Sequence, residues 1–150
     1  MKKIYLDDIR TPKDNDWVVV RSYDEFVKKV EEIGLDKITH ISLDHDLGDT
    51  AMNEYYNNVS PNYKLNYSNI FEKTGYDACK WLVNHFYDKN PDYTHNSRNY
   101  KKKNKIVFPL VTVHSANPIG CGNMMGYINN FLMNENQTQT CIKNIIEHTV

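Results

Sequence analysis

The stretch ISLDHDLG, residues 41–48, places two aspartates and a histidine directly after an apolar run. Such a run is typical of a strand in a parallel sheet, which is buried on both faces. Parallel sheets bind their ligands beyond the carboxyl ends of the strands. We therefore predict a buried parallel strand that ends in a ligand site formed by Asp44, His45 and Asp46.

Segments of strand character alternate with segments of helical character along the chain. Apolar or β-branched runs predict strands at residues 3–6, 17–20, 37–44 and 105–115. Apolar residues at helical spacing predict helices at residues 22–34, 74–88 and 123–133. This alternation indicates a single α/β domain over residues 1–150, with a mostly parallel sheet of about four to five strands.

Two polar segments rich in Asn and Tyr, residues 49–73 and 88–104, fit neither pattern and are long for loops. We predict that both are surface insertions, and that the lysines at 101–103 form a solvated turn rather than a nucleic-acid patch. Either the first insertion has no role, or it is a lid whose tyrosines stack on a base. The tyrosines in question are Tyr55, Tyr56, Tyr63 and Tyr67.

Composition and charge exclude several classes of function. The formal net charge of -1 gives no electrostatic basis for binding duplex DNA or an anionic membrane. No run reaches the roughly 18 apolar residues of a membrane span, and the N-terminal MKKIYLDD lacks the apolar core of a signal peptide. We therefore expect a cytoplasmic protein. The three cysteines form no C-x-x-C pair, so we predict that they are packing residues.

Three predicted strands end in titratable residues, which a parallel sheet would bring to one edge. Carboxylates gathered there would repel one another unless a cation lay among them. We predict a divalent metal, Mg²⁺ or Mn²⁺ on the basis of the oxygen ligands, with Zn²⁺ as an alternative because imidazoles are near. The alternative role for these aspartates is to cap the turns that follow the strands. The predicted metal ligands are Asp7, Asp8, Asp44 and Asp46.

A second set of residues at this edge suits a phosphate group. Arg10 can reach an anion or pair with a neighbouring aspartate. The stretch HSANPIGCGNM, residues 114–124, combines two glycines that permit close backbone approach with the start of a helix, whose free N–H groups bind phosphate. The predicted substrate-binding residues are Arg10, Ser115, Asn117, Gly120 and Gly122.

Two histidines at neighbouring strand ends suggest a reaction type. Opening a cyclic phosphodiester requires a base for water and an acid for the leaving alkoxide, and imidazoles titrate near neutrality. His45 and His114 could divide these roles, or a metal-bound hydroxide could replace the base. We predict His45, His114 and Asp44 as the catalytic residues, with the His114 side chain at the rim of the edge.

Five blocks of the sequence, taken in order, resemble the cyclic-phosphate-processing receiver domains of bacteria and phages. They are YLDDIRTP, WVVVRSYDEFV, ISLDHDLG, TGYDACKWL and HSANPIGCGNM, and they span residues 3–131. The resemblance implies a receiver-like (flavodoxin-like) three-layer fold and an activity on cyclic phosphates. Its wider relation to two-component receivers implies that Asp7 and Asp8 bind Mg²⁺ and that Asp44 accepts a phosphoryl group.

The sequence also departs from the receiver pattern. The segment between Asp8 and Trp17 is too short for the first crossover helix, which we expect to be lost. We recognise no final strand ending in a lysine after residue 131, and receivers pair that lysine with the phosphoryl group. We therefore expect a metal-dependent phosphoesterase for a small-molecule or RNA-end cyclic phosphate. The rivals are a signalling receiver phosphorylated on Asp44 and a non-catalytic module that binds a nucleotide or a protein partner.

Overall fold

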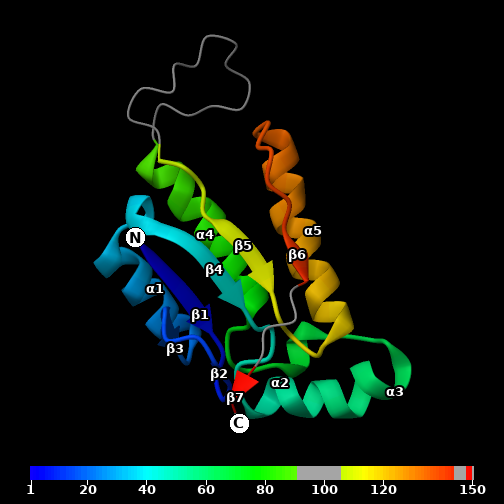
Figure 1. The fold of residues 1–150 in the computed structure, drawn as a ribbon. Coiled ribbons are helices and arrows are strands. Elements are labelled where there is room, and N and C mark those ends of the chain that lie inside the picture. Colours follow the sequence, from blue (N-terminus) through cyan, green and yellow to red (C-terminus); the bar gives the residue numbers. More distant parts are fainter. Residues whose placement is uncertain (91–105, 144–147, 150) are drawn as a thin grey trace.

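A five-stranded parallel sheet forms the centre of the computed structural model, which describes residues 1–90, 106–143 and 148–149 (Figure 1). The strand order is β3-β1-β4-β5-β6, the order of flavodoxin-like folds once the short β2 is set aside. The predicted receiver-like α/β fold is therefore confirmed. The strands are β1 (Lys2–Leu6), β3 (Trp17–Val20), β4 (Ile38–Leu43), β5 (Leu110–Val113) and β6 (Ile142–Lys143).

The predicted helices at 22–34 and 74–88 are present as α1 (Tyr23–Ile33) and α4 (Gly75–Lys89). The Ser22 side chain caps α1 by accepting a hydrogen bond from the Glu25 N–H. Gly34, with φ 93°, ends α1 and leads into the 3₁₀ turn η1 (Leu35–Lys37). A capping box between Thr74 and Asp77 begins α4.

The third helix, α5 (Pro118–Asn134), begins earlier than the predicted start at residue 123. Asn117 caps it and Pro118 occupies its first turn, both of which favour a helix start. Two glycines in the first turns made this stretch look like a loop in the sequence. Residues 118–122, which contain the two glycines expected to approach a phosphate, are therefore part of the helix.

The three helices lie side by side on one face of the sheet, with α4 between α1 and α5 (Figure 1). Their apolar sides cover alternate strand residues such as Ile4, Ile41 and Val111, in one continuous core. The three cysteines are free, buried and part of this core, as predicted.

The opposite face of the sheet carries no helix among the described residues, which form two layers where three were predicted (Figure 1). The connection from β1 to β3 holds only the two-residue strand β2 (Thr11–Pro12), which confirms that the first crossover helix is lost. β2 pairs antiparallel with β7 (His148–Thr149). Tyr5, Ser42 and Thr112 are aligned across this opposite face and are buried.

Residues 49–73 are largely helical, so the prediction that they form no regular element is wrong. The helix α2 (Asp49–Glu54) continues through a π-helical turn η2 (Tyr55–Val59) into α3 (Ser60–Asn62), and the 3₁₀ turn η3 (Tyr67–Asn69) follows. The buried Glu54 carboxylate holds the segment together by accepting hydrogen bonds at 2.7 to 2.9 Å. The donors are the side chains of Asn58 and Asn69 and the backbone N–H of Asn66.

Two further expectations concern the second half of the chain. The segment 88–104 begins within α4, and residues 91–105, including the three lysines at 101–103, lie outside the described residues. The chain does contain a final strand ending in a lysine, because β6 pairs parallel with β5 and ends at Lys143. The expectation that such a strand is missing is therefore wrong.

None of the described helices is long and apolar enough to cross a membrane.

Candidate functional site

The polar residues of the site are fixed by the sheet itself. Beyond each strand end, the next backbone N–H donates to a carbonyl of the neighbouring strand, so the parallel ladder continues by one residue. These bonds run from Asp7 to Val20 (3.1 Å), from Asp44 to Leu6 (2.9 Å) and from His114 to Leu43 (3.0 Å). The positions of these site residues follow directly from strand pairing.

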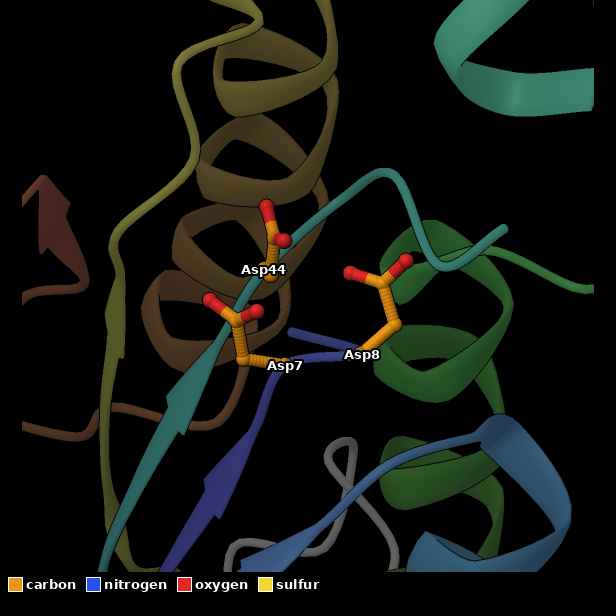
Figure 2. Close-up of side chains that lie close together, drawn as sticks. All are labelled: Asp7, Asp8 and Asp44. Carbon is orange, nitrogen blue, oxygen red and sulfur yellow. The ribbon is translucent and has the colours of Figure 1, made fainter. Parts of the chain in front are cut away.

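Three carboxylates gather above the ends of β1 and β4 (Figure 2). Asp7, Asp8 and Asp44 each offer an oxygen, and these oxygens all lie within 4.8 Å of one another. Asp7 and Asp44 are buried, whereas Asp8 is half-buried. The proximity expected from the strand ends is therefore observed.

Four groups contact the carboxylate of Asp7. Its Oδ1 accepts from the backbone N–H groups of Ile9 (2.9 Å) and Arg10 (2.8 Å). Its Oδ2 accepts from Arg10 Nε at 3.0 Å and lies 3.2 Å from His114 Nε2. Burial alone would raise the pKa of Asp7, but the bonds from His114 and the two N–H groups outweigh burial and lower it to about 2.

Asp44 lies in the opposite electrostatic situation. Burial and the charge of Asp7 raise its pKa to about 7, and the nearby Arg10 and the Ser115 hydroxyl offset this only in part. Burial and Asp7 also raise the pKa of Asp8. Two of the three carboxyl groups are therefore disfavoured as anions, which a bound cation would reverse.

The donor set fits a hard divalent cation such as Mg²⁺ or Mn²⁺. All three groups are carboxylates, and no described imidazole belongs to the cluster, which gives Zn²⁺ no preferred ligand. A carboxylate has about four lone-pair sites for hydrogen bonds, and Asp7 has four contacts. The oxygens of Asp8 and Asp44 are therefore more available to a metal. Arg10 Nη2 lies 3.4 Å from Asp44 Oδ2. This ion pair would have to break if a metal bound the same oxygen.

Arg21 belongs to the site, although the sequence reasoning missed it. Its guanidinium donates to the carbonyl oxygens of Asp7 (3.1 Å) and Arg10 (2.7 Å) and to the Thr11 hydroxyl (2.8 Å). These bonds hold the loop that carries Asp8 and Arg10. Arg21 directly follows β3, so the strand-end rule applied to the other three strands could have found it.

A pocket of about 380 Å³ opens over the carboxylates. Six predicted site residues line it: Asp7, Asp8, Arg10, Asp44, Asp46 and Ser115. The remaining lining residues are Ile9, Met52, Tyr55, Tyr56 and Ala116. The other predicted site residues, His45, His114, Asn117, Gly120 and Gly122, do not line it.

His45 is buried behind the pocket, which does not support its predicted role in proton transfer to a ligand. Its Nδ1 lies 2.7 Å from Asp46 Oδ1 and its Nε2 lies 3.0 Å from the Tyr67 hydroxyl. A Cβ at Gly120 would lie 2.4 Å from the imidazole, so only glycine allows this packing. His45 therefore orients Asp46, which itself lies outside the group of three clustered carboxylates.

Asn117 and Gly120 pack behind the pocket, and neither they nor Gly122 line it. Asn117 Oδ1 accepts from the Gly120 N–H at 2.9 Å, and its Nδ2 donates to Asp46 Oδ1 at 3.2 Å. A Cβ added at Gly122 would meet no atom within 4 Å, so no close approach requires this glycine. Their predicted role in substrate binding is therefore not supported.

His114 is buried, and its side chain is not at the rim where we expected it. Its ring stacks on Tyr5 at 4.2 Å between centroids, and its Nδ1 lies 2.7 Å from the Ser42 hydroxyl. Its Nε2 is directed at Asp7. This arrangement orients a carboxylate of the cluster, as the groups behind metal ligands do.

His114→Ala should therefore lower the free energy of unfolding by about 1 to 3 kcal/mol, because a buried hydrogen-bonded ring is lost. It should also raise the pKa of Asp7, whose carboxylate loses a donor. Chemical denaturation and carboxyl NMR titration measure the two effects. His40→Ala, on the same face and hydrogen-bonded to Thr112 at 3.1 Å, is the matched control for the pKa of Asp7. An unchanged Asp7 pKa would contradict this role.

Comparison with family models identifies the chain. The model of the cyclic-phosphate processing receiver domain matches residues 2–130. The chain belongs to this family. Neither the curated proteins nor the solved structures contain a match to it.

In this receiver domain, Asp7 and Asp8 take the places of the acidic pair and Asp44 that of the third aspartate. Lys143 stands at the end of the last strand, where receivers carry their lysine, but it is not among the residues that line the pocket. The family is that of cyclic-phosphate processing receiver domains, and the cluster lies at the carboxyl edge of its sheet.

Proposed function

We propose that this receiver domain is a metal-dependent phosphoesterase that opens a cyclic phosphate of the nucleotide or RNA-end type. The observation that carries the proposal is the group of three carboxylates within 4.8 Å of one another, beside Arg10, in a family that processes cyclic phosphates. Asp8 and Asp44, supported by Asp7, would hold Mg²⁺ or Mn²⁺. Such an ion supplies charge neutralisation at the phosphate and a more acidic water molecule.

The chain's own residues have distinct roles in this proposal. Arg10 and the Ser115 hydroxyl line the pocket and bind the phosphate oxygens. Water attacks phosphorus, the ring P–O bond breaks and the freed alkoxide takes a proton from solvent. Asp46 accepts the proton of the attacking water, because it faces the pocket while His45 and Asn117 hold its Oδ1.

A metal at this site should change the pH dependence of stability. The pKa of Asp44 in the metal-free protein is raised to about 7, so the folded state binds more protons than the unfolded state between about pH 4 and 7. Stability from this group is present below pH 4 and is lost as the pH rises through 7. Mg²⁺ or Mn²⁺ should therefore raise the melting temperature more at pH 8 than at pH 5. Thermal melts with and without chelator test this, and melts unaffected by either ion at both pH values would contradict the metal site.

The activity test is a screen of the purified protein with Mg²⁺, Mn²⁺ and Zn²⁺. Substrates are 2′,3′-cyclic nucleotides, cyclic mono- and dinucleotides, and ADP-ribose cyclic phosphate. Turnover that a chelator abolishes supports the phosphoesterase. Absence of turnover with every substrate and every ion would contradict the proposed phosphoesterase activity.

Phosphorylation of Asp44 is the second candidate function. Lys143 at the end of β6 favours it, because receivers pair the lysine of their last strand with the phosphoryl group. Treatment with acetyl phosphate, followed by mass spectrometry, would detect an acyl phosphate on Asp44. Asp44→Asn is the matched control.

A further inference from the structure

The pocket over the carboxylates has a second wall of different chemistry. Asp8, Arg10 and Asp44 form a charged side, whereas Met52, Tyr55 and Tyr56 come from the helical segment that follows β4. A pocket that joins charged groups to aromatic rings suits a ligand with a phosphate at one end and a flat apolar group at the other.

Two consecutive tyrosines at the start of the π-helical turn line the same pocket. Tyr55 begins the π turn, and the rings of Tyr55 and Tyr56 meet edge to face, 5.2 Å apart and at 66°. Single π turns of this kind are frequent at functional sites.

Part of this wall is exposed although it is apolar. Tyr56 is 64% exposed, and Ile9, which also lines the pocket, is 67% exposed. A planar group stacked on Tyr56 would cover part of this exposed surface. Aromatic side chains stack on nucleobases in this way, and every base offers a suitable face.

The size and charge of the pocket favour one nucleotide over the end of an RNA chain. Its volume of about 380 Å³ lies near the lower end of small-molecule sites, which span about 300 to 1,000 Å³. Sites that follow a nucleic-acid backbone have a groove of several basic residues. Arg10 is the sole basic residue in the pocket lining that the structure describes.

We propose that the pocket takes a mononucleoside cyclic phosphate, with its base on Tyr55 and Tyr56 and its phosphate between Asp8, Arg10 and Asp44. The inference rests on the proposed function for the cyclic phosphate. The recognition of the base rests on the aromatic wall alone.

Calorimetry with two ligands that cannot be turned over tests the aromatic wall separately from catalysis. 3′-AMP carries a base and glycerol 2-phosphate does not, and both are titrated in the presence of Mg²⁺. Tyr56→Ala should weaken 3′-AMP binding by about 5- to 150-fold, the range for one base stack, and leave glycerol 2-phosphate unchanged. Tyr56→Phe should bind like the wild type. Tyr63→Ala is the control, since Tyr63 is exposed in the same segment but outside the pocket lining.

Three results would overturn the inference: no binding of 3′-AMP, equal weakening of both ligands by Tyr56→Ala, or an unchanged affinity in that variant. Tighter binding of a 3′-phosphorylated trinucleotide than of 3′-AMP would instead identify an RNA end as the ligand. If Tyr56→Ala behaves as expected but the activity screen finds no turnover, the nucleotide site stands and the phosphoesterase alone fails.

Discussion

Asp44→Asn should abolish most metal-dependent turnover while making the metal-free protein more stable. The variant removes a proposed metal ligand, and loss of a preorganised charge that stabilises the transition state costs about 10²- to 10³-fold in rate. It also removes a buried carboxyl group whose pKa is raised to about 7 by burial and by Asp7. At pH 8 that shift corresponds to a gain of at most about 4 kcal/mol in the free energy of unfolding.

Denaturant unfolding at pH 5 and pH 8 measures the gain, which should be larger at pH 8. Asp16→Asn is the matched control, because its side chain is 78% exposed and its ion pair with Lys3 spans 3.8 Å. We expect that control to change stability by no more than about 0.5 kcal/mol. A variant Asp44→Asn that fails to fold would instead favour a structural role for this aspartate as a turn cap.

Gly75→Ala should damage the site from a position outside the pocket. A Cβ at Gly75 would lie 1.9 Å from the backbone oxygen of Asp44, far inside contact distance. The Gly75 N–H also donates to the carbonyl of His45 at 2.9 Å, so the start of α4 and the strand-end loop must move apart. We expect a loss of about 3 kcal/mol or more in the free energy of unfolding, together with weaker Mg²⁺ binding.

Gly126→Ala is the control within another helix, where an added Cβ would meet nothing within 4 Å. It should raise stability by up to about 1 kcal/mol, because alanine is the better helix former. Unfolding curves for both variants and Mg²⁺ titrations provide the comparison. Similar stability of the two variants would show that the close packing of α4 on Asp44 is relaxed in solution.

The sequence predicts which residues reach the site edge, but not where each side chain points. Asp44, His45 and Asp46 are consecutive, and both aspartates line the pocket while the histidine between them turns inward against Gly120. The alternation of side chains along β4 ends at Leu43, so no sequence pattern shows in which direction each of the next three side chains points. The carboxylate cluster could therefore be foreseen from the strand ends, whereas the inward direction of the His45 ring could not.

The helical character of residues 49–73 was missed because its stability has a polar source. Helix prediction depends on an apolar stripe, but this segment is organised by Glu54, a buried carboxylate with three donors from within the segment. Glu72 adds a hydrogen bond to the Ala51 N–H at 2.8 Å near the start of α2. Long-range polar pairs of this type leave no periodic trace in the sequence.

The self-contained bonding around Glu54 has a consequence for how this domain could be redesigned. The carboxylate cluster is attached to strand ends, whereas the aromatic wall belongs to a segment whose internal hydrogen bonds do not involve the cluster. A different segment could be grafted between Gly48 and Thr74 without moving Asp7, Asp8 or Asp44. Ligand preference could then be exchanged as a cassette, provided that the new segment keeps a hydrogen-bond partner for His45 in place of Tyr67.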